Sequence, residues 1–387
     1  MERFDVIVVG GGVAGASCLY HLAARGVTRT LLLERTSLCA GSSGRSAAFV
    51  ETLYTDEDRV RWTQATARLL ERLASEHDVP FVQHGKLQLA HDERQLRRYV
   101  TTLALREDDG ARVVEPAEVE RLAPAMRTDD LAGAIFGPRD GWVDPPRVCD
   151  VLTALAHEAG AEVRRAEVTG VRLEHGRVAG VDTTAGAVAA PVVVNAAGSW
   201  AARVSQLAGI AIPVAGHRRE IVVLEDGRAG AGDLPLVVDP VGEDGDSLYL
   251  RGDGGGLVVA GFHTENPAHD PPADPDSFMT TIDDSAMVSL APLLERRYRG
   301  AEDLGFRGGW AGLYPLTPDG SPVLGEAVAV PGFHHLAGLG GNGIQLSGGL
   351  GRVAADLVVD GSSPLLPDAP RYALERFPAG SSAGVSG

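Results

Sequence analysis

Residues 4–15 read FDVIVVGGGVAG, and this stretch decides the fold. The apolar run from Phe4 to Val9 is typical of a buried parallel strand, and the glycines after it form the pattern G-x-G-x-x-G. A helix predicted over residues 16–25 and a second strand over residues 30–33 continue the unit. Glu34 closes that strand, at the distance from the glycines where dinucleotide-binding units carry an acid. The combination predicts a dinucleotide site.

Each glycine of the pattern has its own physical task. Gly10 permits the tight turn, Gly12 lets the backbone approach a pyrophosphate, and Gly15 lets helix and strand pack closely. The helix N-terminus offers unpaired N–H groups and partial positive charge to the phosphates. Glu34 can accept a hydrogen bond from a ribose hydroxyl. Its charge would repel a 2′-phosphate, so NADP is not the expected ligand.

The composition is that of a soluble globular protein, with 44% hydrophobic and 22% charged residues in 387. A formal net charge of −17 argues against binding to nucleic acid or to an anionic membrane surface. No apolar run reaches the length of a membrane span. The three cysteines are scattered and show no metal-ligand or disulfide spacing, so we expect no metal and a cytoplasmic location.

The pattern of predicted strands and helices changes along the chain. Alternating strand patterns between about residues 212 and 310 predict an antiparallel sheet, and a strand, glycine loop and helix return over residues 333–359. We therefore expect an α/β fold, with a Rossmann-type domain and an inserted, mainly antiparallel substrate domain. The expected ranges are 1–80, 141–211 and 311–365 for the discontinuous nucleotide-binding domain, 81–140 and 212–310 for the substrate domain, and 379–387 for a disordered tail.

The second glycine loop, Gly338–Gly343, has three interpretations. It could be a second nucleotide fingerprint, but no strand with a terminal acid follows its helix. It could be a plain tight turn. The interpretation we favour is a helix N-terminus aimed at an electron-rich group such as the pyrimidine edge of a reduced flavin, with backbone N–H groups from Gly341 to Gln345 as donors.

Six motifs occur in an order that identifies a family. They are the opening fingerprint, GSSGRSAA at 41–48, DGWVDP at 140–145, NAAGSW at 195–200, WAGLYPLTPDG at 310–320 and GLGGNGIQ at 338–345. From Phe4 to about Asp360 the chain resembles the FAD-dependent D-amino-acid oxidase superfamily. That superfamily includes sarcosine oxidase, glycine oxidase, D-amino-acid dehydrogenases and proline dehydrogenase β subunits.

The resemblance implies that the chain binds FAD. Relatives that attach flavin covalently use a Cys where Gly312 stands, or a His where Arg45 stands, so noncovalent FAD is expected. The implied cofactor-binding residues are Gly10, Gly12, Val13, Ala14, Gly15, Glu34, Arg35, Ser42, Ser43, Arg45, Ser46, Ala47, Val168, Ala197, Gly198, Trp200, Gly312, Gly340, Gly341, Asn342, Gly343, Ile344 and Gln345.

The family reaction removes a hydride from the carbon that bears an amine and leaves an imine. The resemblance implies five substrate-side candidates: Arg218 as a carboxylate-binding group, and Tyr249, His263, Tyr314 and Tyr54. Each also has a structural interpretation; Arg218 could be a surface charge at a strand end, and Tyr249 a cross-strand aromatic.

Two departures from the family pattern matter. Tyr314 and Gln345 stand where other branches have a carboxylate-binding Arg and Lys. Carboxylate recognition would then rest on Arg218 or on another residue, or the substrate is not a simple amino acid. Val259 stands where sarcosine oxidase has an oxygen-activating Lys, which favours a dehydrogenase over an oxidase. The electron acceptor stays open between O2, a quinone and a partner protein. The alternatives are a 2-hydroxy-acid dehydrogenase and a flavin-binding subunit of a larger complex.

Overall fold

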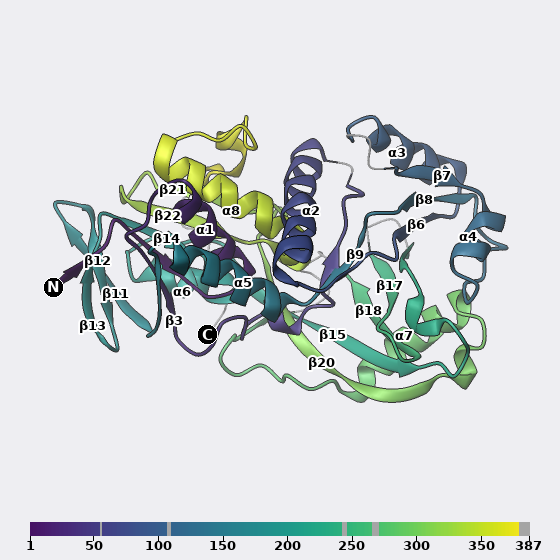
Figure 1. The fold of residues 1–387 in the computed structure, drawn as a ribbon. Helices are drawn as coiled ribbons and strands as arrows, with labels where there is room; N and C mark the ends of the chain where they lie inside the picture. The colour runs from purple at the N-terminus through teal and green to yellow at the C-terminus, as the bar shows by residue number, and fades with distance from the viewer. Residues whose placement is uncertain (55, 107–109, 242–245, 265–270, 379–387) are drawn as a thin grey trace.

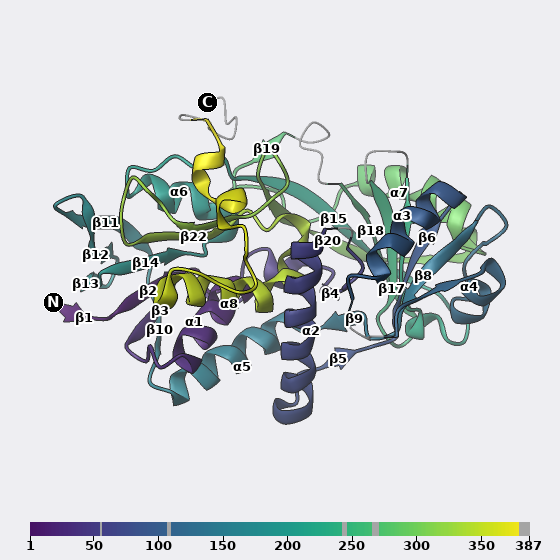
Figure 2. The ribbon, with the colours of Figure 1, turned by 90° about the horizontal axis from the view of Figure 1, so that it is seen from above.

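The computed structural model describes all residues except 55, 107–109, 242–245, 265–270 and 379–387, so the tail expected at 379–387 lies outside the described residues. Figures 1 and 2 show two halves, with helix α2 between them. The helices are α1 (Val13–Ala24), α2 (Glu57–His77), α3 (Glu93–Leu103), α4 (Pro116–Leu122), α5 (Pro145–Glu158), α6 (Ala201–Gln206), α7 (Asp284–Arg297) and α8 (Gly343–Asp360).

One half is built on a mainly parallel sheet with the strand order β10-β3-β2-β14-β22-β21. Of these strands, β21 at the edge runs antiparallel to its neighbour. The central strands are apolar on both faces because helices and loops cover both sides. The strands are β2 (Val6–Val9), β3 (Thr30–Glu34), β10 (Glu162–Arg165), β14 (Val192–Asn195), β21 (Val323–Glu326) and β22 (Phe333–Ala337).

The other half is built on a larger, mainly antiparallel sheet with the order β19-β15-β18-β17-β16-β6-β8-β7, in which β20 also pairs with β15. One face packs on α4 and α7 through a hydrophobic core. The strands are β6 (Lys86–Ala90), β7 (Arg112–Val114), β8 (Gly133–Gly137), β15 (Ala215–Glu225), β16 (Leu236–Pro240), β17 (Ser247–Gly252), β18 (Leu257–His263), β19 (Pro272–Ala273) and β20 (Gly305–Leu316).

Two small sheets complete the described strands. One has the order β1-β13-β12-β11, and the other, β4-β9-β5, lies beside α2. Their strands are β1 (Glu2–Arg3), β4 (Phe49–Val50), β5 (Phe81–Val82), β9 (Gly141–Val143), β11 (Val168–Glu174), β12 (Arg177–Thr183) and β13 (Gly186–Ala189).

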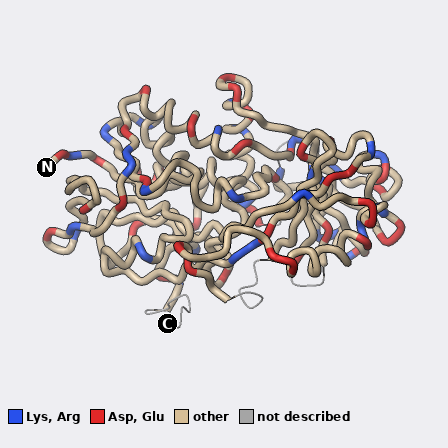
Figure 3. The backbone as a smooth tube through the Cα atoms, turned by 90° about the horizontal axis from the view of Figure 1, so that it is seen from below, with Lys and Arg blue, Asp and Glu red and all other residues tan. Residues whose placement is uncertain are grey.

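The expected fold class is confirmed: a Rossmann-type α/β half and a second, mainly antiparallel half. The exact domain division stays a prediction, and β20 runs through the boundary expected at residue 310. Among the described residues no helix is long and apolar enough to cross a bilayer. Nor does any cluster of His, Cys, Asp and Glu within them offer a metal site. Figure 3 shows acidic and basic residues interspersed over both halves.

Glycines in α8 allow three helices to pack closely. A Cβ added at Gly351 would lie closer than 3.0 Å to Ser17 of α1, and one added at Gly349 would lie closer than 3.0 Å to the backbone of Trp62 in α2. The Gly349 N–H also donates to the Thr66 hydroxyl at 3.0 Å. Because the obstacle is backbone, α2 and α8 would have to move apart to admit a side chain.

Gly349→Ala should therefore destabilise the protein by roughly 1–3 kcal/mol, the usual cost of overpacking a core. Urea unfolding measures this difference. Gly227→Ala is the matched control, since a Cβ at Gly227 meets nothing within 4 Å. Equal stability of the two variants would contradict the packing account.

Candidate active site

Four neighbouring parallel strands end on one cavity. The cavity is lined by Gly10 after β2, Glu34 at the end of β3, Ala196 to Gly198 after β14, and Gly338 after β22. The chain order reverses between β3 and β14, the two neighbours of β2, and such switch points are where open α/β sheets bind ligands. The cavity has a volume of about 1020 Å³, at the upper end of the roughly 300–1,000 Å³ of small-molecule sites.

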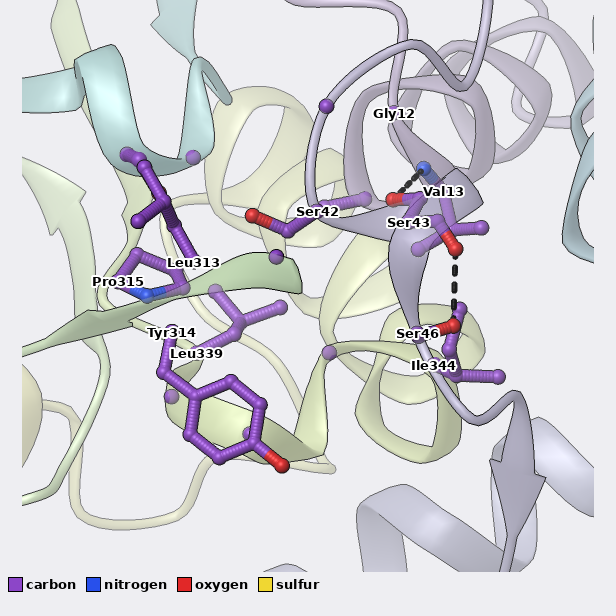
Figure 4. A pocket seen from close by; sticks show the side chains of 18 of the residues that line it. Gly12, Val13, Ser42, Ser43, Ser46, Leu313, Tyr314, Pro315, Leu339 and Ile344 are labelled. Atoms are coloured by element: carbon purple, nitrogen blue, oxygen red, sulfur yellow. Dashed lines mark hydrogen bonds between the residues drawn. The ribbon is translucent and has the colours of Figure 1, made fainter. Parts of the chain in front are cut away.

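The first glycine loop is shaped to admit a phosphate. Gly10 has φ of +113°, and a Cβ there would press on the Ala196 carbonyl. Gly12 precedes α1 with no capping side chain, and the Val13 N–H donates to the Ser43 hydroxyl at 3.2 Å (Figure 4). Gly15 does not line the cavity; a Cβ there would collide with the Gly10 carbonyl, so its task is the predicted close packing.

Glu34 holds the glycine loop in place. Its carboxylate accepts hydrogen bonds from the N–H groups of Gly11 and Thr36, both at 2.8 Å, while the side chain lines the cavity. The neighbouring Arg35 guanidinium lies 4.6 Å from the centre of the Trp200 ring. Val168 lines the same end of the cavity. This end can therefore enclose the adenosine part of a dinucleotide.

The segment from Ser42 to Ala47 runs along the cavity. Ser46 Oγ donates to the Ser43 carbonyl at 2.8 Å, as Figure 4 shows. Arg45 is turned toward the Ala40 carbonyl, and its own carbonyl accepts from Trp310 Nε1 at 2.8 Å. Gly312 lies directly against Arg45, where a Cβ would be 3.1 Å from Arg45 Cβ. All the residues expected from this segment line the cavity.

A second helix N-terminus meets the same cavity. Residues from Gly340 to Gln345 line it, and α8 begins there with neither a capping side chain nor an acidic residue in its first turn. Gly341 lies under the rings of Tyr314 and His263, where a Cβ would touch both. The uncapped N–H groups of α1 and α8 thus leave two positive helix ends open to one ligand, an arrangement that fits FAD.

Four of the five substrate-side candidates line the cavity together. The ring centres of His263 and Tyr314 are 5.7 Å apart. Tyr54 OH donates to Asn342 Oδ1 at 2.8 Å. Tyr249 packs edge-to-face on Phe49 with ring centres 5.0 Å apart, and burial raises the pKa of its hydroxyl well above the usual value.

The fifth candidate, Arg218, points away from the cavity. Its guanidinium donates to Glu220 at 2.7 Å and to the carbonyls of Met279 and Thr281. Side chains alternate along β15, so the next residue, Arg219, lines the cavity instead. Arg219 is 6% exposed and lies 5.4 Å from the centre of the Tyr314 ring. Arg219 therefore replaces Arg218 as the candidate carboxylate-binding group.

Sequence reasoning also missed an ion pair in the cavity wall. Lys86 of β6 pairs with Glu51, and both side chains line the cavity. Gln345 Nε2 donates to Glu51 at 3.2 Å and to the Tyr54 hydroxyl at 2.7 Å. The available signal was a lysine at the start of the alternating strand pattern of residues 86–90, where burial is costly unless the charge is paired, although nothing local identifies Glu51 as the partner.

The fold and the site define a Rossmann-type dinucleotide-binding protein in which an antiparallel sheet faces the nucleotide-binding loops across one cavity. A family model described as FAD dependent oxidoreductase (DAO) matches residues 5–357, and the chain belongs to this family. Its cofactor is FAD. The expected superfamily and cofactor are both confirmed.

Known relatives agree with this assignment. The chain is 32% identical over 392 residues to mitochondrial sarcosine dehydrogenase of Mus musculus, covering 96% of this chain and 41% of the relative. It is 28% identical to glycine oxidase of Geobacillus kaustophilus, covering 92% and 93%. The crystal structure of that oxidase aligns with a TM-score of 0.80 and 26% identity, covering 98% of this chain and all of that one.

A solved L-proline dehydrogenase from P. horikoshii shares the fold, with a TM-score of 0.87 and 23% identity over 97% of this chain and 98% of that one. The chain spans about two fifths of the length of the curated sarcosine and dimethylglycine dehydrogenases that it matches.

We expect FAD to be released when the holoprotein is precipitated with acid. Gly312 offers no attaching group, and the buried cysteines Cys18, Cys39 and Cys149 do not line the cavity. The yellow colour should stay in the supernatant, which absorbance of both fractions measures. Flavin retained in the washed pellet would contradict noncovalent binding.

Proposed function

We propose that this chain uses FAD to oxidise the C–N bond of an amino acid, an N-alkyl amino acid or a cyclic imino acid. The observation that carries the proposal is the shared cavity, in which a sheet bearing Arg219, Tyr249 and His263 faces the nucleotide-binding loops. Similarity to sarcosine dehydrogenase and glycine oxidase supports the substrate class. When bound, FAD accepts a hydride at flavin N5 from the carbon next to the nitrogen, which leaves an imine.

The FAD-binding roles expected from the sequence belong to the same proposal. The N-terminus of α1 would hold the pyrophosphate, Glu34 a ribose hydroxyl, and residues 42–47 the length of the cofactor. The N-terminus of α8 would stabilise negative charge on the reduced flavin, because its N–H groups and its dipole both favour an anion.

The substrate would be held by residues of the antiparallel sheet. Arg219 would bind the carboxylate, since a guanidinium fork matches its two oxygens. The rings of Tyr249, Tyr314 and His263 would exclude water and hold the substrate against the cofactor. This buried setting favours the neutral amine, whose lone pair assists departure of the hydride.

Two other functions are compatible with the same cavity. A 2-hydroxy acid would use the same carboxylate-binding group. A flavin-binding subunit of a larger complex is the other interpretation. One relative is called a regulatory subunit: the mitochondrial pyruvate dehydrogenase phosphatase regulatory subunit of Mus musculus, which is 26% identical and covers 92% of this chain. The polar, aromatic substrate wall favours catalysis over a purely structural role.

A dehydrogenase is favoured over an oxidase. Val259 is fully buried beside Tyr249 and Ala47, at the position where the sarcosine-oxidase resemblance expects a lysine. A fixed cation there would favour electron transfer to O2. A cytoplasmic location also stays part of the proposal, on the evidence of the scattered free cysteines, although several curated relatives are mitochondrial.

An anaerobic substrate panel tests the proposal. Sarcosine, glycine, proline, D-alanine and matched 2-hydroxy acids are mixed with the holoprotein, and flavin absorbance is followed. We expect an amine to bleach the flavin and to outpace every hydroxy acid. Admitting air afterwards should then restore the colour slowly. Bleaching by hydroxy acids alone, or by nothing, would contradict the proposed reaction, and rapid recovery in air would contradict the dehydrogenase preference.

A pair of adjacent substitutions tests the carboxylate site. Arg219→Met should raise the KM for the amine substrate roughly 10- to 150-fold, because a hydrogen bond to a charged group contributes about 1.5–3 kcal/mol. Arg218→Met is the matched control and should change KM less than about twofold, as its side chain faces away from the cavity. Steady-state kinetics with a fixed artificial acceptor measures both. The reverse ranking would restore Arg218 as the binding group.

A further inference from the structure

Among the described residues, four carboxylates line the cavity: Glu34, Glu51, Glu167 and Asp276. Three of them belong to the nucleotide end. Glu34 binds the glycine loop, and Glu167 and Asp276 lie 3.9 and 2.6 Å from the Arg35 guanidinium. Glu51 alone of these four follows β4 and pairs with the substrate sheet. A cationic amine held against that sheet therefore has one carboxylate within the cavity wall to bind.

Glu51 is held firmly in position. Lys86 pairs with Oε2, and Gln345 donates to Oε1 at 3.2 Å. The N–H and hydroxyl of the next residue, Thr52, donate to Asp140 Oδ1 at 3.0 and 2.9 Å, which fixes the backbone. The Glu51 side chain is only 13% exposed to solvent, and Glu51 lines the cavity.

Two substrate candidates connect to Glu51 through one intervening residue each. Phe49, two residues before Glu51 in the chain, packs on Tyr249. The Gln345 amide that binds Glu51 also binds the Tyr54 hydroxyl at 2.7 Å. Glu51 thus lies between the aromatic wall and the N-terminus of α8.

The buried Lys86–Glu51 ion pair costs desolvation free energy, which a purely structural role does not explain. Lys86 is 2% exposed, and a buried pair repays the cost of desolvating two charges only with excellent geometry. Well-packed apolar residues of similar volume are often at least as stable. A charged pair on a cavity wall therefore indicates a role toward what enters the cavity.

We propose that Glu51 binds the ammonium group of the substrate and accepts its proton before the hydride leaves. This inference rests on the proposed function. The Glu51 carboxylate takes one N–H proton and becomes a carboxylic acid, and the electron pair of that bond stays on nitrogen. The neutral amine then loses a hydride, with both electrons of the C–H bond, to FAD. Lys86 is a positioning residue that fixes the Glu51 carboxylate at the cavity wall.

The groups that face Glu51 could also shape a pH profile. They are Lys86, Tyr54, Asp140 through Thr52, and Arg106, whose guanidinium contacts the Thr52 hydroxyl. Burial raises the pKa of Asp140 to about 7, so Asp140 is the group whose titration would most easily be mistaken for that of Glu51. Asp140 does not line the cavity.

The test is the anaerobic rate of flavin reduction by sarcosine as a function of pH. Glu51→Gln should lower the rate roughly 1,000-fold at about pH 7, within the range of general-base effects. The rate should then rise about tenfold per pH unit and approach that of the wild type toward about pH 10, where an alkylamine is neutral in water. The single variant leaves a buried lysine without its carboxylate. If it fails to fold for that reason, the double variant Glu51→Gln/Lys86→Met removes both charges, and the same rates are then measured on it.

Three results would overturn the inference. One is a folded single or double variant with the pH profile of the wild type. Another is a rate of flavin reduction near neutral pH that is lost in Asp140→Asn but kept in Glu51→Gln. That result would assign the proton acceptor to Asp140. The third is a wild type that no amine in the panel reduces, which would remove the proposed function as well. Reduction of the wild type together with an unchanged Glu51→Gln profile removes this inference alone.

Discussion

The structure depends on two helix N-termini that open onto the same cavity. The N-cap residues of α1 and α8 make no side-chain hydrogen bond to the helix, and neither first turn contains an acidic residue. The Val13 N–H donates to Ser43, and the other first-turn N–H groups and the partial positive charges of both helices face the cofactor end of the cavity. The two helices begin at loops that follow β2 and β22, the strands on either side of β14 in one parallel sheet. One extended, electron-rich cofactor can satisfy both, which is why residues near opposite ends of the chain contribute to one site.

Close helix packing makes this convergence possible. Gly351 and Gly349 let α8 approach α1 and α2, and Gly15 lets α1 approach the turn after β2. The antiparallel sheet then closes the cavity from the other side, and β20 brings Gly312 against Arg45. The proposed substrate-side residues Arg219 and Tyr314 meet Gly341 of the second glycine loop at this junction, so the shape of the cavity depends on how the two halves pack.

Local sequence patterns predicted the fold well because the deciding signals are short-range. The G-x-G-x-x-G loop with its flanking strand and helix, and the strand, glycine loop and helix expected over residues 333–359, follow from neighbouring residues. The cofactor-facing candidates line the cavity for the same reason, except Gly15, whose predicted role was packing.

The substrate side could not be predicted as well. A one-residue shift along a strand reverses the face, and the sequence alone did not tell Arg218 from Arg219. The pairing of Lys86 with Glu51 joins residues 35 positions apart through the assembled sheet, and no local pattern indicates it. Site residues whose position depends on strand register or on long-range contacts can be identified only when the pairing of the strands is known.

Titration of the flavin-free protein with FAD, followed by isothermal calorimetry, tests the central claim most directly. One equivalent of FAD should bind per chain, because both helix N-termini serve a single cofactor. A correctly folded protein that binds no FAD, or that binds two equivalents at separate sites, would contradict the account.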